Sequence, residues 1–259
     1  MDLKELTKRY GTLPARPEHL SVVTNSIDMG FAAGKAALHD LTLILYYGER
    51  EISFPTRAVI PNTEKPHPAF IYISDSGDIP SKFLPAEEIA DRGFAIFCIS
   101  REDIAPNGTK RGLARTLLPG KKYVGGHALL AFAAMRIADY TEKLTTIDSS
   151  RLCAIAHGEL AEAALLSAAY DRRFSYAMSN CPDTESESSL YCKASFSLSG
   201  NERIEKLCEL LDICGKRAII SAPRDDICSD ELLKYSGLRL RDGTRYLSRE
   251  DWQFYMDVI

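Results

Sequence analysis

One stretch, residues 147–173, constrains the fold of this chain more than any other: IDSSRLCAIAHGELAEAALLSAAYDRR. Its polar start, DSS, predicts a turn, because short polar side chains hydrogen-bond to their own backbone. The apolar run at residues 152–156 is typical of a parallel strand buried on both faces. From Glu159 onward, apolar and small residues recur at helical spacing, so the period changes from 2 to 3.6. The stretch therefore predicts a strand that turns sharply into a helix.

The same alternation runs through most of the chain. It predicts a mostly parallel central sheet with helices on both faces, an α/β fold. Upstream, two extended segments joined by Gly48 and Glu49 predict an antiparallel hairpin at the sheet edge. We predict strands at residues 38–47, 51–60, 68–74, 94–100, 152–156, 174–180, 216–222 and 238–241, and helices at residues 86–92, 126–143, 201–214 and 229–236.

Length and composition favour one core. A chain of 259 residues with 45% hydrophobic content is long enough to bury a sizeable interior. The first 34 residues contain two prolines and one short helical pattern at residues 3–10. We therefore expect an N-terminal arm at residues 1–34 and a single domain at residues 35–259.

The central stretch also carries a family resemblance. Residues 151–162 read RLCAIAHGELAE and residues 170–174 read YDRRF. They resemble the nucleophile elbow of the carbohydrate-esterase branch of the α/β-hydrolases, the glucuronoyl esterases and acetyl xylan esterase-like proteins. The pattern there is R-I-x-V-x-G-H-S-R-x-G-K, with D-E-R-F further on. A second likeness, IADRGFAIFCISREDIAPN at residues 89–107, places Asp103 near the expected site.

The resemblance covers about residues 35–259 and implies an α/β-hydrolase fold with an antiparallel N-terminal edge hairpin. Members usually insert long loops after the strand at residues 174–180, whereas only residues 181–199 intervene here. The lid is therefore expected to be reduced.

The resemblance places the three catalytic positions at Gly158, Asp226 and Arg245, in the nucleophile–acid–histidine order of the fold. Glycine has no side chain with which to attack an ester. Arginine stays protonated near neutral pH, so it cannot act as a general base. The triad is thus degenerate, and no intact set of catalytic residues is present.

Further departures surround these positions. Glu159 and Glu162 stand where the family has Arg and Lys. The loop SDSGD at residues 74–78 follows the strand that supplies an oxyanion-hole amide in the family. A carboxylate there would oppose a developing negative charge, although an ordinary polar loop is an equal interpretation. The resulting pocket candidates are His157, Glu159, Ser74, Asp75, Asp103, Asp225 and Cys181, of which Cys181 is the leading substitute nucleophile.

Three functional hypotheses follow. The first is a binding or regulatory pseudoenzyme in which Arg245 pairs with a carboxylate of the old triad or binds a small carboxylate ligand, such as a sugar acid. The second is an active hydrolase with a non-standard set of catalytic residues. The third is a structural subunit that partners an active paralogue. Homo-oligomerisation is compatible with all three.

Composition argues against several other classes of function. A net charge of −4 gives no electrostatic reason to expect nucleic acid or an anionic membrane as a partner. Seven cysteines without a CxxC pair favour reduced, buried thiols in a cytoplasmic protein. We expect no metal and no cofactor, because no ligand spacing is present. The polar N-terminus and the lack of an apolar run of about 20 residues give no sign of a signal peptide or a membrane span.

Overall fold

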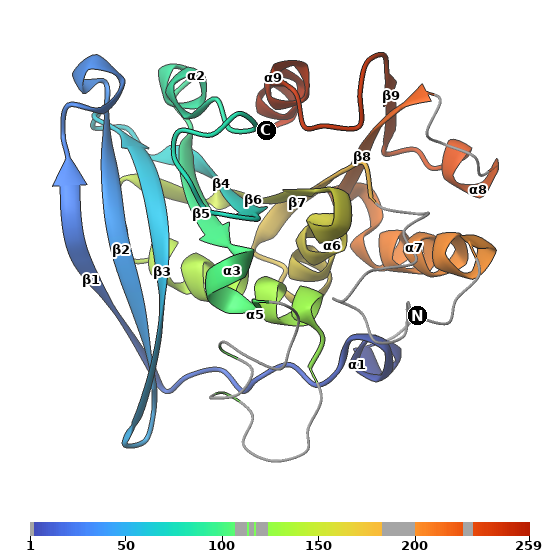
Figure 1. The fold of residues 1–259 in the computed structure, drawn as a ribbon, viewed down its shortest axis with the longest axis horizontal. Helices are drawn as coiled ribbons and strands as arrows, with labels where there is room; N and C mark the ends of the chain where they lie inside the picture. The colour runs from blue at the N-terminus through green and yellow to red at the C-terminus, as the bar shows by residue number, and fades with distance from the viewer. Residues whose placement is uncertain (1–2, 107–112, 114–116, 118–123, 183–199, 225–229) are drawn as a thin grey trace.

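The computed structural model describes residues 3–106, 113, 117, 124–182, 200–224 and 230–259. Within them, nine strands form one sheet in the order β1-β2-β3-β5-β4-β6-β7-β8-β9 (Figure 1). The strands are β1 (His19–Asp28), β2 (Ala36–Tyr47), β3 (Arg50–Pro61), β4 (His67–Ser74), β5 (Ala95–Ser100), β6 (Ile147–His157), β7 (Phe174–Asn180), β8 (Ala218–Pro223) and β9 (Leu238–Arg241).

Strands β1, β2 and β3 are antiparallel, and β3 joins β5 in antiparallel pairing. From β5 to β9 all neighbouring strands are parallel. The carboxyl ends of six strands therefore meet at one edge of the sheet, where loops from distant parts of the sequence come together. The predicted mostly parallel α/β sheet is confirmed.

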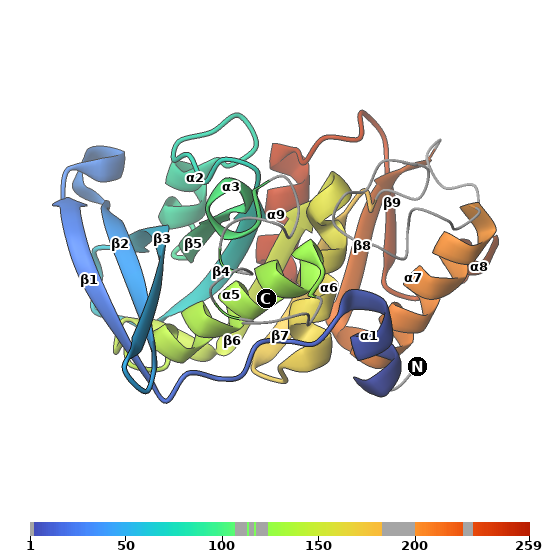
Figure 2. The ribbon, with the colours of Figure 1, turned by 60° about the horizontal axis from the view of Figure 1, so that its bottom comes forward.

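Helices cover both faces of this sheet (Figures 1 and 2). The long helices are amphipathic or wholly apolar, so they bury their apolar surface against the strands. One face carries α2 (Ala86–Asp91) and α9 (Arg249–Val258), and the other carries α5 (Gly126–Thr141), α6 (Ala161–Tyr170) and α7 (Gly200–Cys214). Short elements are α3 (Arg101–Ile104), α8 (Asp230–Leu233) and the 3₁₀ turns η1 (Phe31–Gly34), η2 (Gly158–Leu160) and η4 (Gly215–Arg217).

Alternation along the central strands explains the two cores. In β4, Ala69, Ile71 and Ile73 join the core under α5 and α6. Their neighbours Phe70 and Tyr72 join the core under α2 and α9. Successive side chains of a strand point to opposite faces, so an unbroken apolar run fills both layers.

The first helix, α1 (Leu3–Tyr10), agrees with its predicted range. Leu6 and Tyr10 are buried in the core that contains α5 and α6, so α1 packs on the outside of that layer (Figure 2). Backbone contacts tie it further: the amide of Gly125 donates to the carbonyl of Tyr10 over 2.6 Å.

The predicted antiparallel edge is confirmed by the hairpin of β2 and β3, and β1 adds a further, outermost strand along β2. The structure differs from the sequence predictions in three places. No strand was predicted within residues 1–34. Residues 148–150, predicted as a turn, belong to β6, although Asp148 still accepts a turn-like hydrogen bond from the amide of Ser150. Helix α9 was also missed.

Candidate functional site

Strand β6 changes to helix at Gly158. This residue has φ of +59°, in the left-handed region that glycine adopts with little strain. A Cβ atom built there meets no other atom within 4 Å. The corner is therefore sharp, it faces open space, and it is followed at once by η2 and α6. A side chain at this position would project freely, and glycine provides none.

The open space belongs to a cavity of about 420 Å³ at the carboxyl edge of the sheet. Loops that follow β4, β5, β6, β7 and β9 all contribute to it, as expected where parallel strands end together. Its lining residues are Asp75, Lys82, Phe83, Arg101, His157, Gly158, Glu159, Leu160, Cys181, Arg245 and Tyr246. We call it the elbow pocket.

Arg101 pairs with the carboxylates of the elbow pocket. Its guanidinium lies 3.0 Å from Asp75 and 3.6 Å from Glu159. The two acidic side chains expected to oppose negative charge therefore have a cation between them. Lys82 and Arg245 add two further positive charges to the lining, so cations outnumber carboxylates.

His157 is held by aromatic side chains. Its Nδ1 lies 3.2 Å from the hydroxyl of Tyr72, within hydrogen-bond distance, and its ring stacks on Tyr72. The ring of Phe83 lies 5.0 Å away on another side. Burial lowers the pKa of His157, which favours the neutral imidazole near pH 7.

An aromatic pair forms one wall of the pocket. Phe83 stacks on Tyr246 with ring centroids 5.6 Å apart, and Tyr246 is 62% exposed. The ammonium group of Lys82 lies 4.7 Å from the centroid of Phe83. This wall thus combines flat apolar surface with positive charge.

Arg241 shapes the loop that carries Arg245 and Tyr246. Its guanidinium donates to the carbonyls of Thr244 (2.6 Å) and Tyr246 (3.0 Å). It also approaches the sulfur of Cys181, at 3.6 Å. One buried guanidinium therefore fixes the backbone of a loop on the pocket rim.

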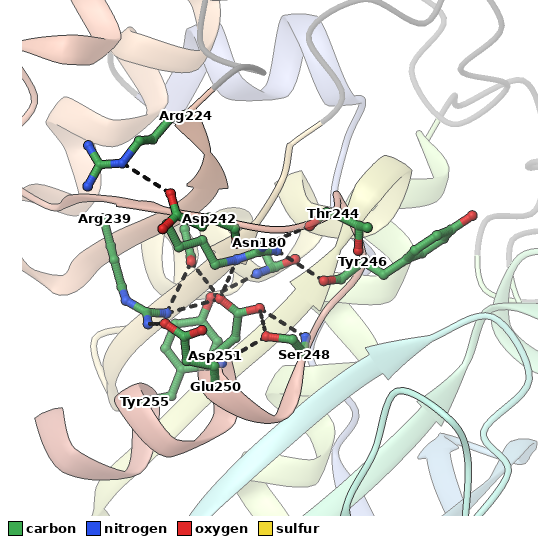
Figure 3. A network of polar contacts seen from close by, with 12 residues as sticks. Asn180, Arg224, Arg239, Asp242, Thr244, Tyr246, Ser248, Glu250, Asp251 and Tyr255 are labelled. Atoms are coloured by element: carbon green, nitrogen blue, oxygen red, sulfur yellow. Dashed lines mark hydrogen bonds and ion pairs between the residues drawn. The ribbon is translucent and has the colours of Figure 1, made fainter.

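Arg241 is itself held by Asp251 of α9, which is fully buried. Figure 3 shows Asp251 with the side chains of Arg239 and Ser248 around it. The same carboxylate binds Arg239 at 3.0 Å and accepts hydrogen bonds from the hydroxyls of Ser221 and Ser248. Sequence reasoning missed this network. The pattern Ser248-Arg-Glu-Asp251 was available as a capping-box signal for a helix start.

Side chains of α5 and α1 also hydrogen-bond to the elbow. His127 of α5 donates from Nε2 to the carbonyl of Glu159 over 2.6 Å. Tyr10 of α1 donates its hydroxyl to Glu162 over 2.6 Å. His127 thus holds the backbone of the corner.

Some predicted site residues lie elsewhere. Asp103 lines a separate cavity of about 420 Å³ with Asp40 and Asp78, and burial raises its pKa. Ser74 is buried and accepts a hydrogen bond from the amide of Gly77, so it shapes the loop without lining the elbow pocket. Asp225, Asp226 and most of the predicted short lid at residues 181–199 lie outside the described residues.

The solved structures that are similar to this chain include three esterases. A glucuronoyl esterase from Solibacter usitatus has a TM-score of 0.77 at 18% identity, covering 96% of this chain and 87% of that one. A promiscuous CE15 esterase from the marine bacterial metagenome has a TM-score of 0.77 at 18% identity, covering 98% and 88%. This chain has the α/β-hydrolase fold.

The third is a glucuronoyl esterase mutant from Sporotrichum thermophile in complex with methyl 4-O-methyl-β-D-glucopyranuronate. Its TM-score is 0.60 at 15% identity, covering 86% of this chain and 64% of that one. No protein-family model matches the sequence, and no curated protein matches it either. The similarity to the solved esterase structures confirms the predicted α/β-hydrolase scaffold, similar to carbohydrate esterases.

Two further properties concern only the described part of the chain. No three His, Cys, Asp or Glu residues there are grouped closely enough to hold a metal ion. None of its helices is both long and apolar enough to cross a membrane.

Proposed function

We propose that this α/β-hydrolase scaffold binds a small carboxylate ligand, such as a sugar acid, without hydrolysing esters. The observation that carries the proposal is Gly158 at the tip of the elbow, facing the open pocket without a nucleophile. Arg245, which the family resemblance aligns with the histidine base, lines the same pocket, and a guanidinium cannot accept a proton near pH 7.

The lining supports a ligand with one negative charge and a flat apolar face. Lys82 and Arg245 supply positive charge, and an Arg guanidinium can bind a carboxylate with two parallel hydrogen bonds. Phe83 and Tyr246 present a stacked aromatic wall on which a sugar ring can pack. A similar solved structure holds a glucuronic acid derivative, which makes uronic acids the first ligands to test.

The test begins with ester hydrolysis by the wild-type chain and by a Gly158→Ser/Arg245→His double variant, with aryl esters and a methyl glucuronate ester as substrates. We expect no wild-type turnover above the buffer rate. Activity in the double variant would further support an intact scaffold that lacks only its reactive groups. Wild-type turnover would contradict the proposal.

Binding is measured separately, by calorimetry with D-glucuronate and with uncharged D-glucose. Wild type should bind glucuronate more tightly than glucose, because only the acid carries the carboxylate. Lys82→Ala should weaken glucuronate binding about tenfold, the loss of one charged contact of roughly 1.4 kcal/mol. Lys8→Ala, at an exposed lysine of α1, is the matched control. Equal affinity for acid and sugar would contradict recognition of the carboxylate.

A second candidate function rests on Cys181. This residue lines the elbow pocket, has φ of +45°, and lies 3.6 Å from the Arg241 guanidinium, which would stabilise a thiolate. Hydrolysis with Cys181 as nucleophile would be lost in Cys181→Ser and retained in Cys153→Ser, a buried cysteine of β6. The third hypothesis, a structural partner of an active paralogue, stays a prediction.

A further inference from the structure

The edge strand β1 has an unusual outer surface. Nine of its ten residues pair with β2, and no other strand of the described residues pairs with β1 (Figure 1). One backbone group of the strand has a side-chain partner, because the ammonium of Lys143 donates to the carbonyl of Leu20 over 2.9 Å. Edge strands are commonly protected by lysine, proline or a covering segment, and β1 contains neither residue type. Such an edge is suited to pairing with another strand.

Exposed apolar side chains gather along the same edge. In the described part of the chain, five large hydrophobic residues are exposed, and three of them are Val23 (46%), Ile27 (50%) and Met29 (59%). The other two, Leu233 and Tyr246, lie on α8 and in the elbow pocket. Val23 pairs with Thr42 and Ile27 with His39, so these two side chains lie on opposite faces of the strand. Exposed apolar side chains on both faces of an edge strand can be covered by a second strand added beside it.

A bulge makes the strand self-complementary. Pairing with β2 steps from Thr24–Leu41 to Ser26–Asp40, so Asn25 stands out of register. Nine paired positions remain, and Val23 is the central one. Around a two-fold axis at Val23, an antiparallel copy would place Val23 opposite Val23, with Leu20 opposite Ile27, Ser21 opposite Ser26, Val22 opposite Thr24 and His19 opposite Asp28.

The side-chain directions in β1 are compatible with this register. Leu20 pairs with Leu45 and Ile27 with His39, two positions that point to the same side of β2, so Leu20 and Ile27 share a face. Opposed residues in an antiparallel pair must share a face, and here the bulge is what brings this about. The two ends of the strand are also compatible, because the imidazole of His19 would lie opposite the carboxylate of Asp28.

We propose that β1 pairs with β1 of a second copy, antiparallel about a two-fold axis at Val23, so that the two sheets become continuous. The partner is a second copy because the strand complements itself: apolar side chains oppose apolar side chains, and an N–H of the His19 imidazole can donate to the Asp28 carboxylate. A two-fold homodimer is the commonest symmetric assembly. The proposal does not depend on the ligand or on the activity of the elbow pocket.

The first experiment is sedimentation equilibrium of the full chain over a wide concentration range. The mass should rise from 28.8 kDa toward twice that value as concentration increases. Val23→Lys would place two like charges opposite each other and should weaken dimerisation at least about tenfold. Leu233→Lys, at an equally exposed hydrophobic residue of α8, is the matched control and should dimerise as wild type does.

A monomer at every concentration would overturn the proposal, as would a dimer that Val23→Lys leaves unchanged. Circular dichroism confirms that each variant is folded. A dimer lost in both lysine variants would also overturn it, because the effect would then not belong to β1.

The register is tested by cross-linking. In Val23→Cys the two thiols would face each other across the axis and should form a covalent dimer under mild oxidation. In Ser21→Cys the thiols would be four positions apart, about 13 Å along the strands, too far for a disulfide. Wild type, whose described cysteines are free thiols, is run in parallel. Equal cross-linking of both variants would overturn the proposed register.

Discussion

At the scale of single residues, Gly158 links conformation to chemistry. The elbow needs a left-handed backbone, which costs most residues roughly 1–2 kcal/mol and costs glycine little. A serine placed there in a hydrolase is held under strain so that its hydroxyl reaches the substrate. With glycine, the corner keeps its shape with less strain and without a reactive group. Glycine at this corner therefore leaves the backbone with little strain and the pocket without a nucleophile at this position.

His157 gives a residue-scale prediction about pH. Its pKa is lowered by burial, so the unfolded chain binds a proton more readily than the folded chain does. Stability should therefore fall as the pH drops through about 6.5, the ordinary histidine value. In His157→Gln this part of the pH dependence should disappear.

The free energy of unfolding in urea, measured above and below that pH, checks this prediction. Tyr72→Phe serves as the control, because it removes the hydroxyl beside Nδ1 and leaves the imidazole buried. An identical acid slope in wild type and His157→Gln would count against it.

At the scale of secondary-structure elements, α9 holds the site together. Its first turn carries Asp251, which completes a capping box with Ser248 and binds the guanidinium groups of Arg239 and Arg241. Arg241 in turn holds the loop of Arg245 and Tyr246. A helix cap and a pocket rim are thus built from the same carboxylate (Figure 3).

The element-scale prediction concerns Asp251→Asn. It should lower the free energy of unfolding by about 3–5 kcal/mol, because two largely buried guanidinium groups lose their shared counter-charge. Glu250→Gln removes the neighbouring carboxylate, which pairs with Arg239 and is mostly exposed, and should cost about 1 kcal/mol or less. Urea unfolding of both variants checks this. Equal losses in the two variants would contradict the assigned role of Asp251.

At the scale of the whole molecule, both ends of the sequence reach the elbow region. Tyr10 of α1 donates to Glu162 of the elbow helix α6. The indole of Trp252 donates to the carbonyl of Phe83 over 2.8 Å and packs edge-on against Phe70 and Tyr72. The pocket therefore depends on contacts between residues far apart in the sequence.

Trp252→Phe tests this dependence. The variant keeps an aromatic ring in the core but leaves the Phe83 carbonyl without its donor, at a cost of about 1–3 kcal/mol. We expect faster amide hydrogen exchange in residues 81–84 in addition to lower stability. Phe254→Leu, a partly exposed neighbour on α9, should leave exchange in that loop unchanged. Unchanged exchange in Trp252→Phe would contradict the link between α9 and the pocket loop.

Local patterns in the sequence were sufficient to predict most of the helices and strands. Buried parallel strands such as β4 and β7 are short apolar runs, and helices such as α5 have their own period, so each is readable without its neighbours. The position of Gly158 at a strand–helix corner followed from the change of period and from the family resemblance. The edge strand β1 was missed because its mixed polar and apolar residues show little burial, and a half-exposed strand gives a weak pattern.

The sequence by itself determined the α/β architecture and the strand–helix corner at Gly158, and the family resemblance aligned Gly158 and Arg245 with the serine and the histidine of the esterases. Only the tertiary structure decided that Arg101 pairs with Asp75 and Glu159, that Asp103 lies in another cavity, and that Asp251 anchors the rim through Arg241. The reason is physical: period and propensity are properties of neighbouring residues. Ion pairs and pocket walls depend on which strand ends the sheet order brings together.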